Sequence, residues 1–145
     1  MGQKKAPVIL LAIDGSPESV KAAKYAFKIA GMLGREVLCI SVIASPLLVR
    51  RMNPALVAHY LASAEAQAKK WLSNIEDLAG SVTAKTEIVI DAKSVPEAII
   101  GKASGERAEM IVMGAKGMTF SKRLSLGSVA YTVSAHAECP VLLVR

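Results

Sequence analysis

The chain has 145 residues, of which 52% are apolar, and this combination predicts a single domain spanning residues 1–145. Its longest apolar run, Ala6 to Ile13, is less than half of the roughly 20 residues that a membrane-spanning helix needs, so we expect no membrane partner. A formal net charge of +6 favours anionic ligands, which include nucleotides and nucleic acid.

The distribution of basic and aromatic residues argues against nucleic acid. The lysines and arginines are scattered along the chain. The two phenylalanines and the single tryptophan are not interleaved with them as a platform on which bases could stack. The amino-terminal residues 1–5 lead into an apolar segment without a signal-peptide core, so we expect a cytoplasmic location. Cys39 and Cys139 lack the paired spacing of a zinc or redox site, and we expect them to be buried small apolar side chains.

The first half of the chain alternates short apolar runs with a helical pattern. Residues 7–13 are continuously apolar, which is typical of a strand buried on both faces. Ser16 then stands at a helix N-cap, before a helix predicted from Pro17 to about Gly34. A second buried strand is predicted at 36–43, followed by an irregular stretch at 44–53.

The second half continues this alternation. A long helix is predicted over 53–79, where apolar residues recur at helical spacing. The remaining predicted elements are strands at 82–90, 108–113 and 140–144, and helices at 94–103 and 128–137. Five strands alternating with four helices predict an α/β fold with a doubly wound parallel sheet. Such sheets bind ligands beyond the carboxyl ends of their strands, where the strand order reverses.

One loop at that edge has the composition of an anion-binding segment. Gly114-Ala-Lys-Gly117 follows a predicted strand, and nine residues later Gly127-Ser128 opens the last helix. Glycines allow a ligand to approach the backbone closely, and a helix amino terminus attracts phosphate. No Walker loop is present, because Gly101-Lys102 is followed by Ala103, and no G-x-G-x-x-G follows a strand.

The spacing Gly114-x2-Gly117-x9-Gly127-Ser128 resembles the nucleotide-binding signature of the ATP-binding universal stress proteins. The resemblance covers the whole chain, from Ile13-Asp14-Gly15-Ser16 to the tail 136–145. It implies a Rossmann-like, five-stranded sheet of the adenine nucleotide alpha hydrolase-like type, with strand order 3-2-1-4-5. It also implies a homodimer that pairs through the last strand, residues 140–145. It leaves any other protein partners unknown.

The resemblance carries eleven nucleotide-binding positions over to this chain, with ATP, ADP or AMP as the ligand. They are Ala12 and Ile13 beside the base, Val42 in the adenine pocket, Asp14 near ribose and phosphates, Met113, Gly114, Lys116 and Gly117 in the first half of the phosphate loop, and Gly127, Ser128 and Val129 in the second. Asp14 is also the position at which the resemblance implies indirect Mg²⁺ contact. It implies no catalytic residue.

Three functions remain open at this stage. The glycine loop favours a nucleotide-binding regulatory module of the stress response, which is not an enzyme. Asp14 with Mg²⁺ would also suit a slow ATP hydrolase, although His59 and His136 fall away from the loop and we expect structural roles for them. Phe120 stands where the family often has glycine, and Ser121 and Ser125 replace frequent apolar residues, which keeps a nucleotide-free interaction module open.

Overall fold

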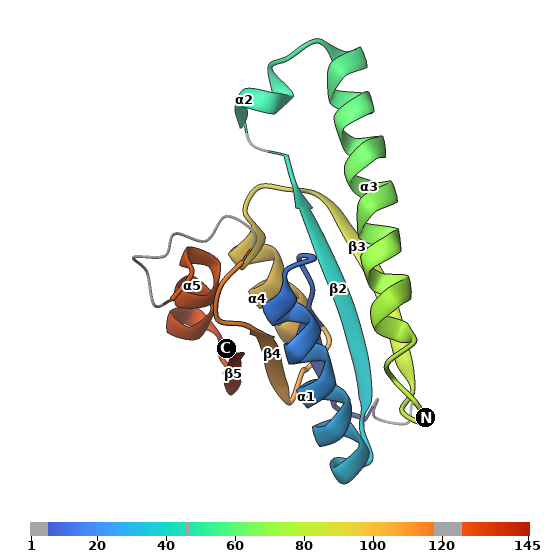
Figure 1. Cartoon of the computed structure of the whole chain (residues 1–145). Coiled ribbons are helices and arrows are strands. Elements are labelled where there is room, and N and C mark those ends of the chain that lie inside the picture. The colour runs from blue at the N-terminus through green and yellow to red at the C-terminus, as the bar shows by residue number, and fades with distance from the viewer. Residues whose placement is uncertain (1–5, 46, 118–125) are drawn as a thin grey trace, which may run out of the picture.

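The computed structural model describes residues 6–45, 47–117 and 126–145. Its five strands form one parallel sheet in the order β3-β2-β1-β4-β5, which confirms the predicted fold class and strand order (Figure 1). The strands are β1 (Val8–Ala12), β2 (Glu36–Ala44), β3 (Ala84–Ala92), β4 (Met110–Gly114) and β5 (Val141–Val144). The helices are α1 (Pro17–Leu33), α2 (Leu47–Arg50), α3 (Pro54–Glu76), α4 (Val95–Gly105) and α5 (Ser128–His136).

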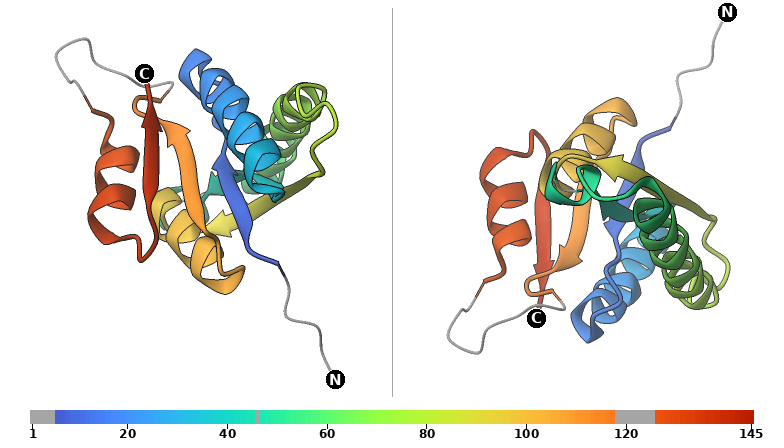
Figure 2. Two further views of the ribbon diagram at one scale, coloured as in Figure 1. Left: turned by 90° about the horizontal axis from the view of Figure 1, so that it is seen from below. Right: turned by 90° about the horizontal axis from the view of Figure 1, so that it is seen from above.

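The helices form a layer on each face of the sheet. Figure 2 shows α1 and α3 on one face and α4 and α5 on the other. Two cores result, because successive strand residues point to opposite faces: Leu11 and Cys39 pack toward α1 and α3, whereas Leu10 and Ile40 pack toward α4. Strands buried on both faces explain why the sequence shows continuous apolar runs in place of alternation.

Three helices begin at a residue whose side chain caps them, and the first of these caps, Ser16, was predicted. Ser16 Oγ accepts a hydrogen bond from the Ser19 amide at 3.1 Å at the start of α1, and Ser94 Oγ accepts one from Glu97 at 3.3 Å at the start of α4. Asn53 caps α3 in the same way through the Ala55 amide at 2.8 Å. A proline at the start of each of these helices fixes a helical φ and removes an amide that would lack a partner.

Several expected element bounds differ from those observed; for example, the fourth strand begins at Met110 and not at 108, and the long helix ends at Glu76 and not at 79. The stretch 44–53 is not wholly irregular, because β2 runs through Ala44 and α2 occupies residues 47–50. The third strand begins at Ala84 and ends at Ala92, two residues later at each end than predicted, because its last residues pair with the extended end of β2. This β2–β3 pair and α3 reach past the end of β1, as Figure 1 shows.

The two cysteines differ in their surroundings. Cys39 is fully buried in the core beneath α1 and α3, as expected, and burial raises the pKa of its thiol to about 12, with a smaller contribution from Glu76. Cys139 is only partly buried and packs against the opposite core. In the part of the chain that the structure describes, no helix is both long enough and apolar enough to span a bilayer.

Candidate functional site

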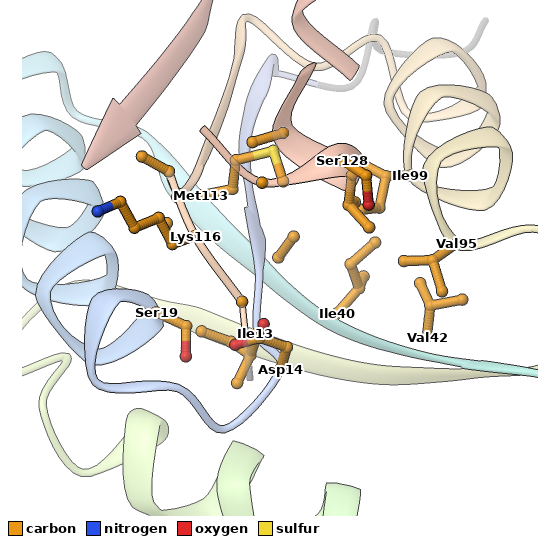
Figure 3. A pocket seen from close by; sticks show the side chains of 17 residues that line it. Ile13, Asp14, Ser19, Ile40, Val42, Val95, Ile99, Met113, Lys116 and Ser128 are labelled. Carbon is orange, nitrogen blue, oxygen red and sulfur yellow. The ribbon is translucent and has the colours of Figure 1, made fainter. Parts of the chain in front are cut away.

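A cavity of about 290 Å³ opens at the carboxyl ends of β1, β2 and β4 (Figure 3). The amino-terminal ends of α4 and α5 complete its walls. After β1 the chain crosses to β2 on one side, whereas β4 lies on the other side of β1, so the cavity occupies the point where the strand order reverses. Its volume is close to the lower end of the range of about 300–1,000 Å³ for small-molecule sites.

The structure brings all eleven predicted positions together around this cavity. They are Ala12, Ile13, Asp14, Val42, Met113, Gly114, Lys116, Gly117, Gly127, Ser128 and Val129. They come from β1, β2, β4, the loop after β4 and the first turn of α5, which are far apart in the sequence. The Ile13 and Met113 side chains line the cavity and also pack into the two cores.

Six further lining residues were not predicted from the sequence. They are Ser19, Ile40, Val95, Ile99, Ala115 and Ala130. Ile40 and Val42 are two residues apart on β2 and so share a face, while Val95 and Ile99 lie one turn apart on α4. Their side chains gather on one side of the cavity in Figure 3 and give it an apolar wall.

A polar group lies at the opposite end of the cavity. Asp14 follows β1, and its Oδ1 accepts a hydrogen bond from the Ser16 amide at 2.9 Å, which closes a turn over Gly15. Its other carboxylate oxygen lies next to Gly117, because a Cβ placed on Gly117 would be only 2.7 Å from Oδ2. The glycine therefore lets the loop after β4 approach the carboxylate.

The loop after β4 is attached to α5 by close backbone contacts. The Gly127 amide donates a hydrogen bond to Ala115 O at 2.7 Å. A Cβ on Gly127 would lie 3.3 Å from that same oxygen and 3.4 Å from Lys116 Cα. At the other end of the loop, a Cβ on Gly114 would lie 2.8 Å from Glu18 Cβ, so α1 packs directly on that glycine. Side chains at these positions would therefore push the walls of the cavity apart.

The amino terminus of α5 differs from those of α1, α3 and α4. Its N-cap is Gly127, which has no side chain to accept a hydrogen bond from the first turn. Ser128, Val129 and Ala130 form that first turn and line the cavity. Amides in a first helical turn have no intrahelical acceptor, and the helix dipole adds about half a positive charge there. The geometry therefore suits an anion such as a phosphate.

Other candidate residues fall outside this arrangement. His59 is exposed on α3, and His136 Nδ1 lies 3.0 Å from Thr132 O within α5, so neither contributes to the cavity lining that the structure describes. Phe120, Ser121, Lys122, Arg123 and Ser125 lie outside the described residues. Within the described ranges, no three His, Cys, Asp or Glu side chains gather as a metal site.

The sheet and the cavity together define an α/β domain with a pocket at its switch point. The chain belongs to the universal stress protein family, whose model matches residues 7–145. Universal stress protein MJ0531 of Methanocaldococcus jannaschii is 36% identical over 141 residues, covering 94% of this chain and 81% of that relative. A universal stress protein of Thermus aquaticus is 36% identical over 144 residues, covering 94% of this chain and 97% of its own.

Solved structures show the same fold. Universal stress protein UspA from Lactobacillus plantarum superposes with a TM-score of 0.84 at 24% identity, covering 99% of this chain and all of that one. The universal stress protein from Archaeoglobus fulgidus in complex with dAMP superposes with a TM-score of 0.72 at 21% identity, covering 97% of this chain and 98% of that one. A universal stress protein in complex with cAMP superposes with a TM-score of 0.73 at 21% identity, covering 96% of this chain and 97% of that one.

Proposed function

We propose that this chain binds ATP or a related adenine nucleotide in the cavity and acts as a regulatory module of the stress response. The observation that carries the proposal is the uncapped first turn of α5, which lines the cavity at the switch point of the sheet. The other three long helices use a serine or asparagine side chain at that position, so α5 is the one of these four that leaves its amino terminus to a ligand.

The two ends of the cavity suit the two ends of a nucleotide. The wall formed by Ile40, Val42 and Val95 offers apolar contact to a base. The first turn of α5 and the loop 114–117 offer backbone amides to phosphates. Asp14 lies at the polar end, where a carboxylate suits ribose hydroxyls. The dAMP and cAMP complexes of proteins with this fold support an adenine nucleotide as the ligand class.

A thermal shift tests the proposal directly. A ligand present at 100 times its dissociation constant stabilises the folded state by about 2.7 kcal/mol. In a domain of this size that gain raises Tm by about 5–10 °C. We expect nucleotide-stripped protein to show this rise with ATP and Mg²⁺, measured by calorimetry. An unchanged Tm would instead favour the nucleotide-free interaction module.

Asp14 is the residue that fits a nucleotide-bound Mg²⁺. It is the one carboxylate among the described residues that line the cavity, and Mg²⁺ commonly takes one or two protein carboxylates together with phosphates and water. The ion would neutralise phosphate charge when bound. Asp14 Oδ1 already accepts the Ser16 amide, so Oδ2, next to Gly117, is the oxygen that remains for the ion or its water shell.

Replacing Asp14 with asparagine separates its hydrogen bond to the Ser16 amide from its proposed contact with Mg²⁺. Asparagine retains an oxygen for the Ser16 amide but loses the negative charge. We expect Mg²⁺ to strengthen ATP binding about 10-fold in the wild type and by less than about 2-fold in Asp14→Asn, measured by titration with and without EDTA. Asp14→Ala, which also removes the turn hydrogen bond, should weaken binding further. An unchanged Mg²⁺ dependence in Asp14→Asn would rule out the metal role.

We expect ATP turnover to be negligible. A fast hydrolase needs a base that positions and deprotonates water, and no histidine lines the cavity within the described chain. Asp14 is the remaining candidate base there, and its Oδ1 already accepts the hydrogen bond that closes the turn. A binding module needs only a different affinity for ATP in two states of the protein. Multiple-turnover phosphate release lost in Asp14→Ala, with ATP affinity intact, would reverse this preference.

We also propose that the protein is a homodimer that pairs through β5. The carbonyls of Pro140 and Val144 accept hydrogen bonds from β4, at 2.9 Å from Ile111 and 2.8 Å from Ala115. Because successive strand residues point their backbone groups to opposite sides, Val141 and Leu143 direct theirs to the outer edge of the sheet. None of the described strands pairs there. An unpaired apolar edge favours association with a second strand.

A proline at Leu143 tests this interface. It removes an outward amide that the β4–β5 pairing does not use, and we expect Leu143→Pro to be monomeric at about 10 μM, where the wild type is a dimer. Leu143→Ala is the matched control, because it loses the side chain and keeps the amide, and it should remain a dimer. Light scattering measures the mass. A monomeric wild type or a dimeric proline variant would contradict the proposed interface.

A further inference from the structure

The turn that carries Asp14 rests on a side chain from outside the cavity. Gly15, at the centre of the turn, has a positive φ of 82°, and a Cβ built on it would overlap the indole ring of Trp71. The ring therefore occupies the position to which a side chain at residue 15 would point. Trp71 lies on α3, is half-buried and packs against the core beneath α1 and α3. A flat aromatic ring thus supports the turn from below.

The same turn is held by its own hydrogen bonds on the other sides. Asp14 Oδ1 accepts the Ser16 amide at 2.9 Å, and Ser16, which is buried, caps α1 through the Ser19 amide. The Asp14 carboxylate is carried by this turn, so its position depends on where the turn lies. Removing the ring beneath Gly15 would leave space into which this turn can move.

We infer that Trp71 is a positioning residue for the nucleotide site, which holds the Asp14 turn against the cavity from α3. The inference rests on the proposed function and extends it to a helix that contributes no residue to the cavity lining in the described chain. Ligand contact at Asp14 then depends on where α3 lies. Trp71 is also the single tryptophan of the chain, so its fluorescence reports on the turn. Ordering of the turn by ATP changes that emission.

The test compares three variants of adjacent α3 residues. Trp71→Ala weakens binding of ATP with Mg²⁺ about 10-fold, because the carboxylate loses its fixed position. Trp71→Phe keeps a flat ring and restores the affinity to within about 3-fold of the wild type. Leu72→Ala is the control, because Leu72 is buried in the same core and its truncation destabilises the fold without touching the turn. Its affinity stays within about 2-fold of the wild type.

A double-mutant cycle distinguishes positioning from general destabilisation. In the Asp14→Asn background, Trp71→Ala costs about 2-fold in affinity in place of about 10-fold, because the charge that the ring positions is already absent. Equal losses in the two backgrounds, or a Leu72→Ala loss as large as that of Trp71→Ala, would overturn the inference. Either result would mean that the tryptophan acts through overall stability.

A readout without nucleotide separates this inference from the proposed function. In nucleotide-free protein the Ser16 amide, which donates to Asp14 Oδ1, exchanges its hydrogen about 10-fold faster in Trp71→Ala than in Leu72→Ala. If the wild type binds no ATP but this difference appears, the proposed function fails and the positioning of the turn stands. If ATP binds and Ser16 exchange is equal in the two variants, the inference on Trp71 fails and the nucleotide site stands.

Discussion

Replacing Gly127 with valine is expected to weaken ATP binding at least about 100-fold while the protein stays folded. The new Cβ would lie 3.3 Å from Ala115 O and 3.4 Å from Lys116 Cα, and the two methyl groups beyond it add to this crowding. The loop and the first turn of α5 would have to move apart, which breaks the 2.7 Å hydrogen bond from Gly127 to Ala115. The amides of the loop and those of the first turn of α5 would then no longer point toward the same phosphate group.

Gly101→Val is the matched control for this substitution. Gly101 lies in α4, and a Cβ there meets nothing within 4 Å. Both variants gain the same side chain, so Gly101→Val should bind ATP as the wild type does, with no loss of stability, because valine has a better helix propensity than glycine. Competition against a fluorescent ATP analogue measures affinity, and circular dichroism checks folding. Equal affinities for the two variants would mean that α5 does not contact the ligand.

Replacing Gly15 with alanine is expected to destabilise the protein by about 3 kcal/mol. Two effects combine, because φ at this residue is 82° and the methyl group would overlap the Trp71 ring. The half-buried ring packs against the core beneath α1 and α3, so moving it away would leave a gap against its neighbours. Urea unfolding with an unchanged m-value measures the loss.

Gly34 separates the two effects at Gly15. Its φ is 64°, and nothing lies within 4 Å of the Cβ that alanine would add. Gly34→Ala therefore carries the cost of the left-handed backbone alone, about 1 kcal/mol. The difference between the two variants is the contribution of the contact with Trp71. If Gly15→Ala proved no worse than Gly34→Ala, the ring would not be in the place that the structure gives it.

The fold was predictable because local signals agreed with the global arrangement. Ser16, Asn53 and Ser94 mark the starts of three helices by their own chemistry, and short apolar runs mark strands that are buried on both faces. The four-residue helix α2 was missed because one turn is too short to show a hydrophobic period. The predicted ends of β3 differ from the observed ones because pairing with β2, which is a tertiary contact, sets where that strand stops.

The glycine spacing predicted the loop and the helix that line the cavity, but not the apolar wall opposite them. Ile40, Val95 and Ile99 carry the same sequence signal as any core residue, and only the fold shows that they line a cavity. Ser19 was hidden in the same way, since its hydroxyl donates to Ser16 O at 2.8 Å as an ordinary part of a helix start. The contact between Trp71 and Gly15 joins segments that are far apart in the chain, so no local sequence pattern predicts it.

Calorimetric titration of nucleotide-stripped protein with ATP and Mg²⁺ tests the central claim most directly. We predict one site per chain with a dissociation constant of about 10 μM, and loss of the binding heat in Gly127→Val under the same conditions. Absence of binding in the wild type across a range of temperatures would contradict the claim. So would unchanged binding in Gly127→Val, because the ligand would then lie elsewhere than at the amino terminus of α5.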